Sequence, residues 1–181
     1  MKLLFIGPPG AGKGTQASLV AKRLGVPHIS TGDMFRHHVS KATDIGKRVK
    51  AIMEAGDYVP DDLTVEMLAE RLAEPDAEAG YILDGFPRTG PQVEALDALI
   101  GPNGLDRVVL FEVDEDALAS RMLTRGRDDD TEETIRNRFK IYQEQTAPLI
   151  ENYEGRGLVV TVDGIGSVED ITNRVLAAVS R

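Results

Sequence analysis

The chain has 181 residues, 41% of them hydrophobic, and this size favours one compact domain over two. Its 21 basic and 30 acidic residues give a net charge of −9, which disfavours extended nucleic acid and anionic membranes as partners. The lack of cysteine excludes disulfides, thiolate nucleophiles and cysteine-held zinc, and no apolar run approaches the roughly 18 residues of a membrane span. The first apolar run is also too short for a secretory signal peptide, so we expect a cytoplasmic protein.

Short apolar runs alternate with longer amphipathic segments along the chain. The runs are rich in branched and aromatic residues and predict strands at Leu3–Ile6, His28–Ser30, Tyr81–Leu83, Val108–Val113 and Leu158–Val162. Strands separated by helical segments predict an α/β fold, in which right-handed crossovers build a parallel sheet covered on both faces. Two consecutive helices, Thr31–Lys41 and Asp44–Ala55, depart from this alternation and are expected to form a small flap. Ligands of such a sheet bind at the carboxyl ends of its strands.

The first strand is followed by a glycine-rich sequence that contains the pattern G-x-x-x-x-G-K, from Gly7 to Lys13. Glycines let successive backbone N–H groups point inward, and the following helix adds its positive end, so the loop predicts a phosphate site. Lys13 would supply a point charge for the outer phosphates. The alternative is a glycine-rich turn with a surface lysine. Gly14 occupies the position of the usual magnesium-ligating hydroxyl, which comes one residue later at Thr15.

Asp84 follows the apolar run of the third strand, as a carboxylate that faces Mg²⁺ does in phosphate-loop enzymes. Because Gly14 offers no hydroxyl, we expect Asp84 to act through metal-bound water. The alternative is that Asp84 caps the turn at Gly85. Of the histidines, His28 is interpreted as a packed residue of the second strand, and no metal pair is predicted.

Arginines recur after the predicted strands. Arg36 follows the second strand, Arg88 the third, and Arg125 and Arg127 the helix after the fourth. Any one of them is more often a surface or salt-bridged residue. Several together, in an acidic chain, favour two phosphorylated ligands that face each other, because planar guanidinium groups clamp phosphate oxygens.

Arg138 belongs to a helix whose predicted start is an N-cap at Asp130 with Glu133 three residues on. The apolar stripe of this helix consists of Ile135, Phe139 and Tyr142, and Arg138 lies within it. A guanidinium on an inward-facing stripe needs an anion as its partner, either a carboxylate or a phosphate. No strong base is required for phosphoryl transfer to a phosphate, which is already mostly dianionic at pH 7.

These features together resemble the adenylate kinases, a family of nucleoside monophosphate kinases. The matching residues are Gly7–Gln16, Ile29–Arg36, Tyr81–Thr89 with Gln92, Arg125–Arg127 and Glu132–Leu149. The resemblance implies a P-loop NTPase-type fold with a five-stranded parallel sheet. It also implies reversible, Mg²⁺-dependent phosphoryl transfer from ATP to AMP, giving two ADP.

Residue by residue, the resemblance implies three sets of roles. ATP would be held by Gly10, Ala11, Gly12, Lys13, Gly14, Thr15, Arg125 and the backbone of Gly166. AMP would be held by Thr31, Arg36, the backbone of Asp57, Tyr58 and Val59, the segment Gly85, Phe86, Pro87 and Arg88, and by Gln92, Arg127 and Arg138. The transferring group would be stabilised by Lys13, Arg88, Arg127 and Arg138, with Asp84 orienting hydrated Mg²⁺ and Asp129 positioning arginines.

The resemblance also implies one domain over residues 1–181, with a mobile AMP-binding flap at 30–59 and a short lid at 126–132. Many bacterial relatives carry a long insertion between the arginines that match Arg125 and Arg127, sometimes with a zinc ion, but here only Gly126 separates them. We therefore expect no zinc. No exposed apolar stripe argues against a monomer, and the resemblance implies ATP, AMP and ADP as substrates. Closure should still occur because water must be kept from the γ-phosphate.

The choice of base rests on Gln92, whose amide offers a donor and an acceptor in one plane and so suits the edge of adenine. Its alternative role is that of a solvated residue in the first turn of a helix. The closest alternative function is a UMP/CMP-type kinase. A nucleotide-binding switch module is a further alternative, although the chain has no N-K-x-D guanine motif and a switch would have no use for Arg36, Arg88 and Arg138.

Overall fold

The computed structural model describes residues 1–125 and 131–180, and of residues 115, 116 and 125 it describes the backbone. The strands are β1 (Lys2–Ile6), β2 (His28–Ser30), β3 (Tyr81–Asp84), β4 (Arg107–Glu112) and β5 (Val159–Asp163). The α-helices are α1 (Lys13–Leu24), α2 (Thr31–Ser40), α3 (Asp44–Ala55), α4 (Asp61–Leu72), α5 (Gly90–Ile100), α6 (Glu115–Arg125), α7 (Glu132–Ile141), α8 (Leu149–Gly155) and α9 (Val168–Val179). A 3₁₀ turn, η1 (Pro75–Ala77), precedes β3, and a π-helical turn, η2 (Tyr142–Thr146), joins α7 to α8.

The strands form one parallel sheet in the order β2-β3-β1-β4-β5. The chain leaves β1 toward β2 and β3 on one side and returns to β4 and β5 on the other, so β1 lies at the switch of direction. The register pairs Asp84 of β3 with Phe5 of β1 and with Ser30 of β2. The segments that follow these strands are thereby brought together at one edge of the sheet, where open α/β sheets bind ligands.

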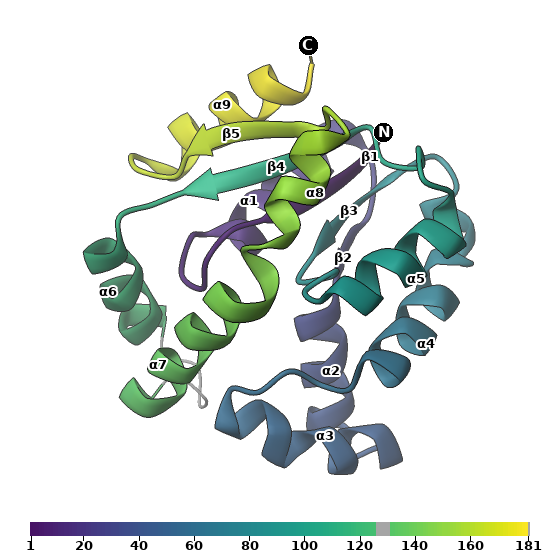
Figure 1. Ribbon diagram of the computed structural model, residues 1–181, viewed down its shortest axis with the longest axis vertical. Helices are drawn as coiled ribbons and strands as arrows, with labels where there is room; N and C mark the ends of the chain where they lie inside the picture. The colour runs from purple at the N-terminus through teal and green to yellow at the C-terminus, as the bar shows by residue number, and fades with distance from the viewer. Residues whose placement is uncertain (126–130, 181) are drawn as a thin grey trace.

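Helices cover both faces of the sheet, and for this reason the strands read as continuous apolar runs. Leu3 and Phe5 of β1 pack with α1 and α9 on one face, whereas Leu4 and Ile6 pack with α4, α5 and α8 on the other. In Figure 1, α8 crosses in front of β4 and β5, while both ends of the chain lie at the opposite end of the molecule from α2 and α3. The predicted α/β fold with a five-stranded parallel sheet is confirmed.

The pair α2 and α3 does not cover the sheet but projects below it (Figure 1). Its apolar residues form a cluster of their own, built on Phe35 and Val49, which continues into α4 through Leu63 and Met67. Within the region 30–59, predicted as a flap, Ser30 is the N-cap of α2, and the apolar packing of the region extends beyond Val59.

The predicted start of the helix that carries Arg138 is wrong by one residue. Thr131, rather than Asp130, is the N-cap of α7, and its side chain accepts a hydrogen bond from the backbone N–H of Thr134 at 3.1 Å. A threonine hydroxyl caps as an aspartate does, so the local pattern did not distinguish two adjacent candidates. Most of the predicted lid, residues 126–130, lies outside the described residues, and its last residue, Glu132, begins α7.

Candidate active site

A cavity of about 770 Å³ lies at the carboxyl ends of β1, β2 and β3. This volume is within the range of about 300–1,000 Å³ that is usual for small-molecule sites. The cavity is lined by every predicted site residue whose side chain the structure describes: Gly10, Ala11, Gly12, Lys13, Gly14, Thr15, Thr31, Arg36, Asp57, Tyr58, Val59, Asp84, Gly85, Phe86, Pro87, Arg88, Gln92, Arg138 and Gly166. Arg125 ends α6, without a described side chain, and Arg127 and Asp129 lie outside the described residues.

The loop after β1 has the backbone form expected of a phosphate cradle. Gly10 and Gly12 adopt left-handed conformations, with φ of 84° and 90°, and α1 begins without a side-chain cap. At Gly10 a Cβ atom would lie 2.7 Å from the carbonyl oxygen of Leu118, so the loop can pass α6 only with glycine here. The Lys13 ammonium donates to the carbonyl oxygens of Gly7 and Pro8, at 2.7 and 3.0 Å. These bonds hold its positive charge above the loop.

Asp84 ends β3 beside this loop and is largely buried, with 12% of its side chain exposed. Its Oδ2 accepts from Nε2 of His28 at 3.3 Å, and Nδ1 of His28 lies 3.1 Å from the hydroxyl of Ser18. Burial disfavours ionisation, but the hydrogen bond from His28 and the charges of Lys13, His28 and Arg88 outweigh it and lower the pKa of Asp84. The site therefore holds a buried carboxylate in its ionised form.

Gly14 is where the loop and Asp84 approach each other. A Cβ atom at this position would lie 3.3 Å from Oδ2 of Asp84, closer than ordinary van der Waals contact. Glycine thus allows the carboxylate to sit directly against the first turn of α1. A serine or threonine at position 14 would supply the usual hydroxyl, but its Cβ would crowd the carboxylate of Asp84.

Two arginines approach the cavity from the segments after β2 and β3. Arg36 pairs with Asp33 one turn earlier on α2, with 2.5 Å between Nη2 and Oδ1, and a third of its side chain is exposed. Arg88 donates from Nε to the carbonyl oxygen of Gly85 at 2.7 Å. Thr31 donates to the same oxygen at 2.8 Å. The carbonyl oxygen of Gly85 therefore joins the segment after β2 to the segment after β3. Gly85 itself adopts a left-handed conformation, with φ of 80°.

Gln92 is almost fully buried, although it lines the cavity. Its amide nitrogen donates to Asp61 at 2.7 Å, and its amide oxygen accepts from the backbone N–H of Arg88 at 2.7 Å. A primary amide has two N–H donors and an oxygen with two lone pairs, so each end keeps one further hydrogen bond to offer. The side chain is oriented by the protein and is not a solvated residue of α5.

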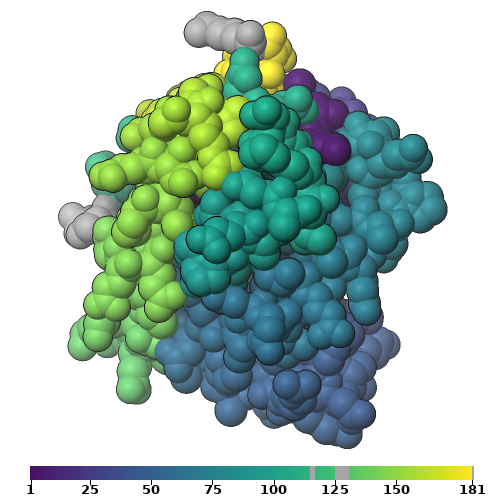
Figure 2. Space-filling view, turned by 45° about the vertical axis from the view of Figure 1, so that its right-hand side comes forward, coloured from purple at the N-terminus to yellow at the C-terminus, as the bar shows by residue number. Residues whose placement is uncertain are grey.

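The flap contacts α7 across the site. Thr134 donates to the carbonyl oxygen of Glu54 at 3.1 Å, and Asn137 donates to that of Ala55 at 3.0 Å and to Asp57 at 2.7 Å. In Figure 2 the blue flap meets the green segment of α7 at the lower left of the molecule. The last carbonyl groups of α3 thus find donors on α7, and the end of α3 lies against this helix.

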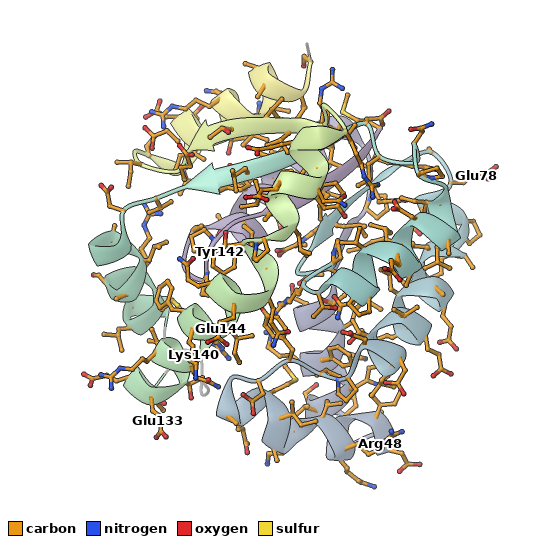
Figure 3. All side chains as sticks on the ribbon, in the orientation of Figure 1. Arg48, Glu78, Glu133, Lys140, Tyr142 and Glu144 are labelled. Atoms are coloured by element: carbon orange, nitrogen blue, oxygen red, sulfur yellow. The ribbon has the colours of Figure 1, made fainter. Side chains whose placement is uncertain are left out.

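The apolar stripe predicted on α7 faces inward. Ile135 and Tyr142 are buried and Phe139 packs against the core, and Arg138 reaches the cavity from the same side. Tyr142, labelled in Figure 3, lines the cavity too, and burial raises its pKa to about 12. It is therefore neutral at physiological pH.

Comparison with known proteins identifies the family. The family model described as adenylate kinase matches residues 5–158, which is most of the chain. The chain is 51% identical over 183 residues to the adenylate kinase of Nocardia farcinica (strain IFM 10152), with 100% of both chains covered. It is 50% identical over 186 residues to that of Kocuria rhizophila (strain ATCC 9341 / DSM 348 / NBRC 103217 / DC2201), with 99% of each covered.

The chain belongs to the adenylate kinase family. Adenylate kinases are phosphotransferases between ATP and AMP, which agrees with the function that the sequence pattern implied. Enzymes of this family generally use Mg²⁺ with ATP. Within residues 1–125 and 131–180, no group of three or more histidine, aspartate or glutamate side chains could hold a metal ion, and no helix is long and apolar enough to cross a bilayer.

Sequence reasoning missed several residues of this adenylate kinase site. Asp61 orients Gln92, and His28 contacts Asp84, although His28 was interpreted only as a packed residue. Arg121 also lines the cavity and donates to the carbonyl oxygen of Gly164 at 3.0 Å. Its position one helical turn before Arg125 was a usable signal, since residues four apart share a helix face. Asp61 and Gln92, 31 residues apart, offered none.

Proposed function

We propose that this chain transfers the terminal phosphoryl group of ATP reversibly to AMP, forming two molecules of ADP in the cavity described above. One observation carries the proposal. The glycine-rich loop after β1 and the arginines Arg36, Arg88 and Arg138 line the same cavity. A simple hydrolase requires one phosphate site and a positioned water, whereas a glycine-rich phosphate loop and several arginines around one cavity suit two phosphorylated ligands.

On the donor side, the backbone of Gly10, Ala11, Gly12, Gly14 and Thr15 would hold the ATP phosphates at the uncapped N-terminus of α1. Lys13 would leave the carbonyl groups of its own loop for the outer phosphates. Arg125 would stack near the base, and the backbone of Gly166 would approach it. Gly166 lies in the segment that Arg121 ties to α6 through Gly164, which supports a defined position for the base.

On the acceptor side, Thr31, Arg36 and the turn from Gly85 to Arg88 would hold AMP, together with the backbone of Asp57, Tyr58 and Val59. Gln92 would select adenine with the donor and the acceptor that it retains after binding Asp61 and the backbone of Arg88. Because both retained groups lie in one amide plane, they match a base edge that presents an acceptor beside a donor.

In the reaction, an oxygen of the AMP phosphate would attack the γ-phosphorus of ATP while the bond from that phosphorus to the β-phosphate oxygen breaks. The attacking phosphate is mostly dianionic at pH 7, so no general base is needed. Lys13, Arg88, Arg127 and Arg138 would neutralise the charge that spreads over the transferring group. Asp129 would position arginines in this set.

The ionised, buried carboxylate of Asp84 fits a hard cation, and it would orient the water shell of the Mg²⁺ that accompanies ATP. A bound Mg²⁺ neutralises charge on the phosphates of ATP. Gly14 has no side chain to ligate the ion directly, which supports contact through water. Activity should survive a zinc-selective chelator at saturating Mg²⁺; loss of activity under these conditions would contradict a zinc-free enzyme.

Residues 30–59 would act as a flap that closes on AMP, and residues 126–132 as a short lid over ATP, within one domain over residues 1–181. The hydrogen bonds of Thr134 and Asn137 to the end of α3 support a flap that closes against α7. The alignment to the Nocardia farcinica enzyme has 183 positions for the 181 residues of this chain, so that relative carries no long insertion either. We propose a monomer that works in the cytoplasm.

The test supplies ATP and Mg²⁺ with each nucleoside monophosphate in turn and measures the nucleoside diphosphates formed. AMP should be the preferred acceptor, with two ADP for each AMP consumed. Preference for UMP or CMP would overturn the assignment of AMP in favour of the pyrimidine-directed alternative. Hydrolysis of ATP at the same rate with and without an acceptor would overturn the kinase assignment altogether.

A further inference from the structure

Arg88 is held by its surroundings at more points than binding of a phosphate by itself requires. Its backbone N–H donates to Gln92 and its carbonyl oxygen accepts from the hydroxyl of Thr146 at 2.9 Å. Its Nε donates to Gly85. The remaining contact comes from the flap: the guanidinium carbon lies 4.9 Å from the centre of the Tyr58 ring. This distance is within the range of a cation–π interaction.

The hydroxyl of Tyr58 links the residue to Arg88 a second time, through a hydrogen bond to Thr146. It lies 2.9 Å from Oγ1 of Thr146. Thr146 has one hydroxyl proton, and it donates that proton to the carbonyl oxygen of Arg88. Tyr58 must therefore be the donor to Thr146. The ring of Tyr58 covers one end of Arg88, while its hydroxyl supports the threonine that holds the other end.

The two partners come from elements that lie far apart in the sequence. Tyr58 lies at the end of the predicted flap, in the segment that joins α3 to α4, whereas Thr146 ends the π-helical turn η2 and is 6% exposed. Thr146 is buried at the end of η2, so the hydroxyl of Tyr58 finds its acceptor only when the end of the flap lies against η2. The orientation of the arginine is thus linked to the position of the flap.

We propose that the side chain of Tyr58 is a positioning residue for Arg88, which it stacks against and orients toward the acceptor phosphate when the flap is closed. The inference deepens the proposed function, on which it rests, because it gives a role to a side chain where the family resemblance assigned only backbone. Tyr58 acts through the arginine and does not itself touch the reacting atoms. Its ring restricts the guanidinium before AMP arrives, which lowers the entropic cost of binding.

The first test replaces the ring. In Tyr58→Leu, kcat/KM for AMP should fall about 3- to 10-fold, the range of a partly exposed cation–π contact, while KM for ATP should stay within twofold. Tyr58→Phe keeps the ring and loses only the hydroxyl, so it should recover most of this loss. Thermal unfolding of each variant reports whether it folds. If Tyr58→Leu is unstable, Tyr58→Met, which is also unbranched at Cβ and lacks a ring, takes its place.

The second test separates an effect through Arg88 from a general effect on the flap. Tyr58→Leu is introduced into Arg88→Ala, and kcat/KM for AMP is compared in the four proteins of the cycle. If Tyr58 acts through the arginine, its replacement should change the activity of Arg88→Ala by less than twofold. An equal fold-loss in both backgrounds, or no loss in Tyr58→Leu, would overturn the inference. Failure of the wild-type protein to form ADP from ATP and AMP would instead overturn the proposed function.

Discussion

Replacement of Arg88 by alanine tests the centre of the proposed chemistry. In the described part of the chain, the guanidinium makes one hydrogen bond, from Nε to Gly85, so both terminal nitrogens can serve phosphoryl oxygens. A hydrogen bond that involves a charged group contributes about 1.5–3 kcal/mol. Two such bonds, made to a group whose charge develops in the transition state, amount to about 3–6 kcal/mol. Arg88→Ala should therefore lower kcat by about 10²- to 10⁴-fold.

The assay couples ADP formation to a spectroscopic signal at saturating ATP and AMP, with thermal unfolding as a check on folding. Arg88→Lys keeps the charge but not the planar fork, so its loss should be intermediate. Arg48→Ala removes the same charge from the same acidic chain, but Arg48 is exposed on the outer side of α3 and does not line the cavity (Figure 3). It should stay within twofold of wild type. A loss of less than tenfold in Arg88→Ala would refute the placement of this arginine on the transferring group.

Three further predictions follow from the loop, the buried carboxylate and the flap. Lys13→Ala should lower kcat by about 10²- to 10³-fold, as loss of a preorganised donor does, and near-normal turnover would contradict its role. Because the pKa of Asp84 is lowered on folding, its ionised form stabilises the protein above the ordinary pKa of about 4, and this stabilisation is lost as the pH falls through the lowered value. In Mg²⁺-free buffer, wild type should therefore lose more stability than Asp84→Asn on acidification below about pH 4, and equal losses would refute the assignment. Gly46→Ala would place Cβ against the carbonyl group of His38, so overpacking of α2 on α3 should destabilise the protein by about 1–3 kcal/mol in denaturant. Gly155→Ala is the matched control and should not destabilise it, because its Cβ would meet no atom of the described residues within 4 Å outside its own stretch of helix.

The parts of the site that follow a strand directly could be read from the sequence. A run of apolar residues, a turn and a polar residue are local features, and the parallel sheet brings the ends of its strands to one edge. Gly12, Lys13, Asp84 and Arg88 were found in this way, and all of them line the cavity. The N-cap of α7 was misplaced because two adjacent polar residues satisfied the same local rule.

Other contacts of the site join residues far apart in the chain and leave no periodic signal. His28 contacts Asp84 across 56 residues, and Tyr58 reaches Thr146 across 88. The sequence does not indicate which histidine contacts Asp84 or which tyrosine contacts Thr146, because no local pattern distinguishes these residues from the other histidines and tyrosines of the chain. The partners depend on which strands are neighbours and on where the flap meets the core.

The sequence by itself therefore determined the class of the fold, the phosphate loop and the strand-end positions of the charged residues, because each depends on contacts within a few residues of chain. The tertiary structure decided how those groups are oriented. It buried Asp84 against Gly14, fixed the amide of Gln92 between Asp61 and Arg88, and placed the ring of Tyr58 on the guanidinium. Orientation is set by packing between elements, and packing is a property of the whole fold.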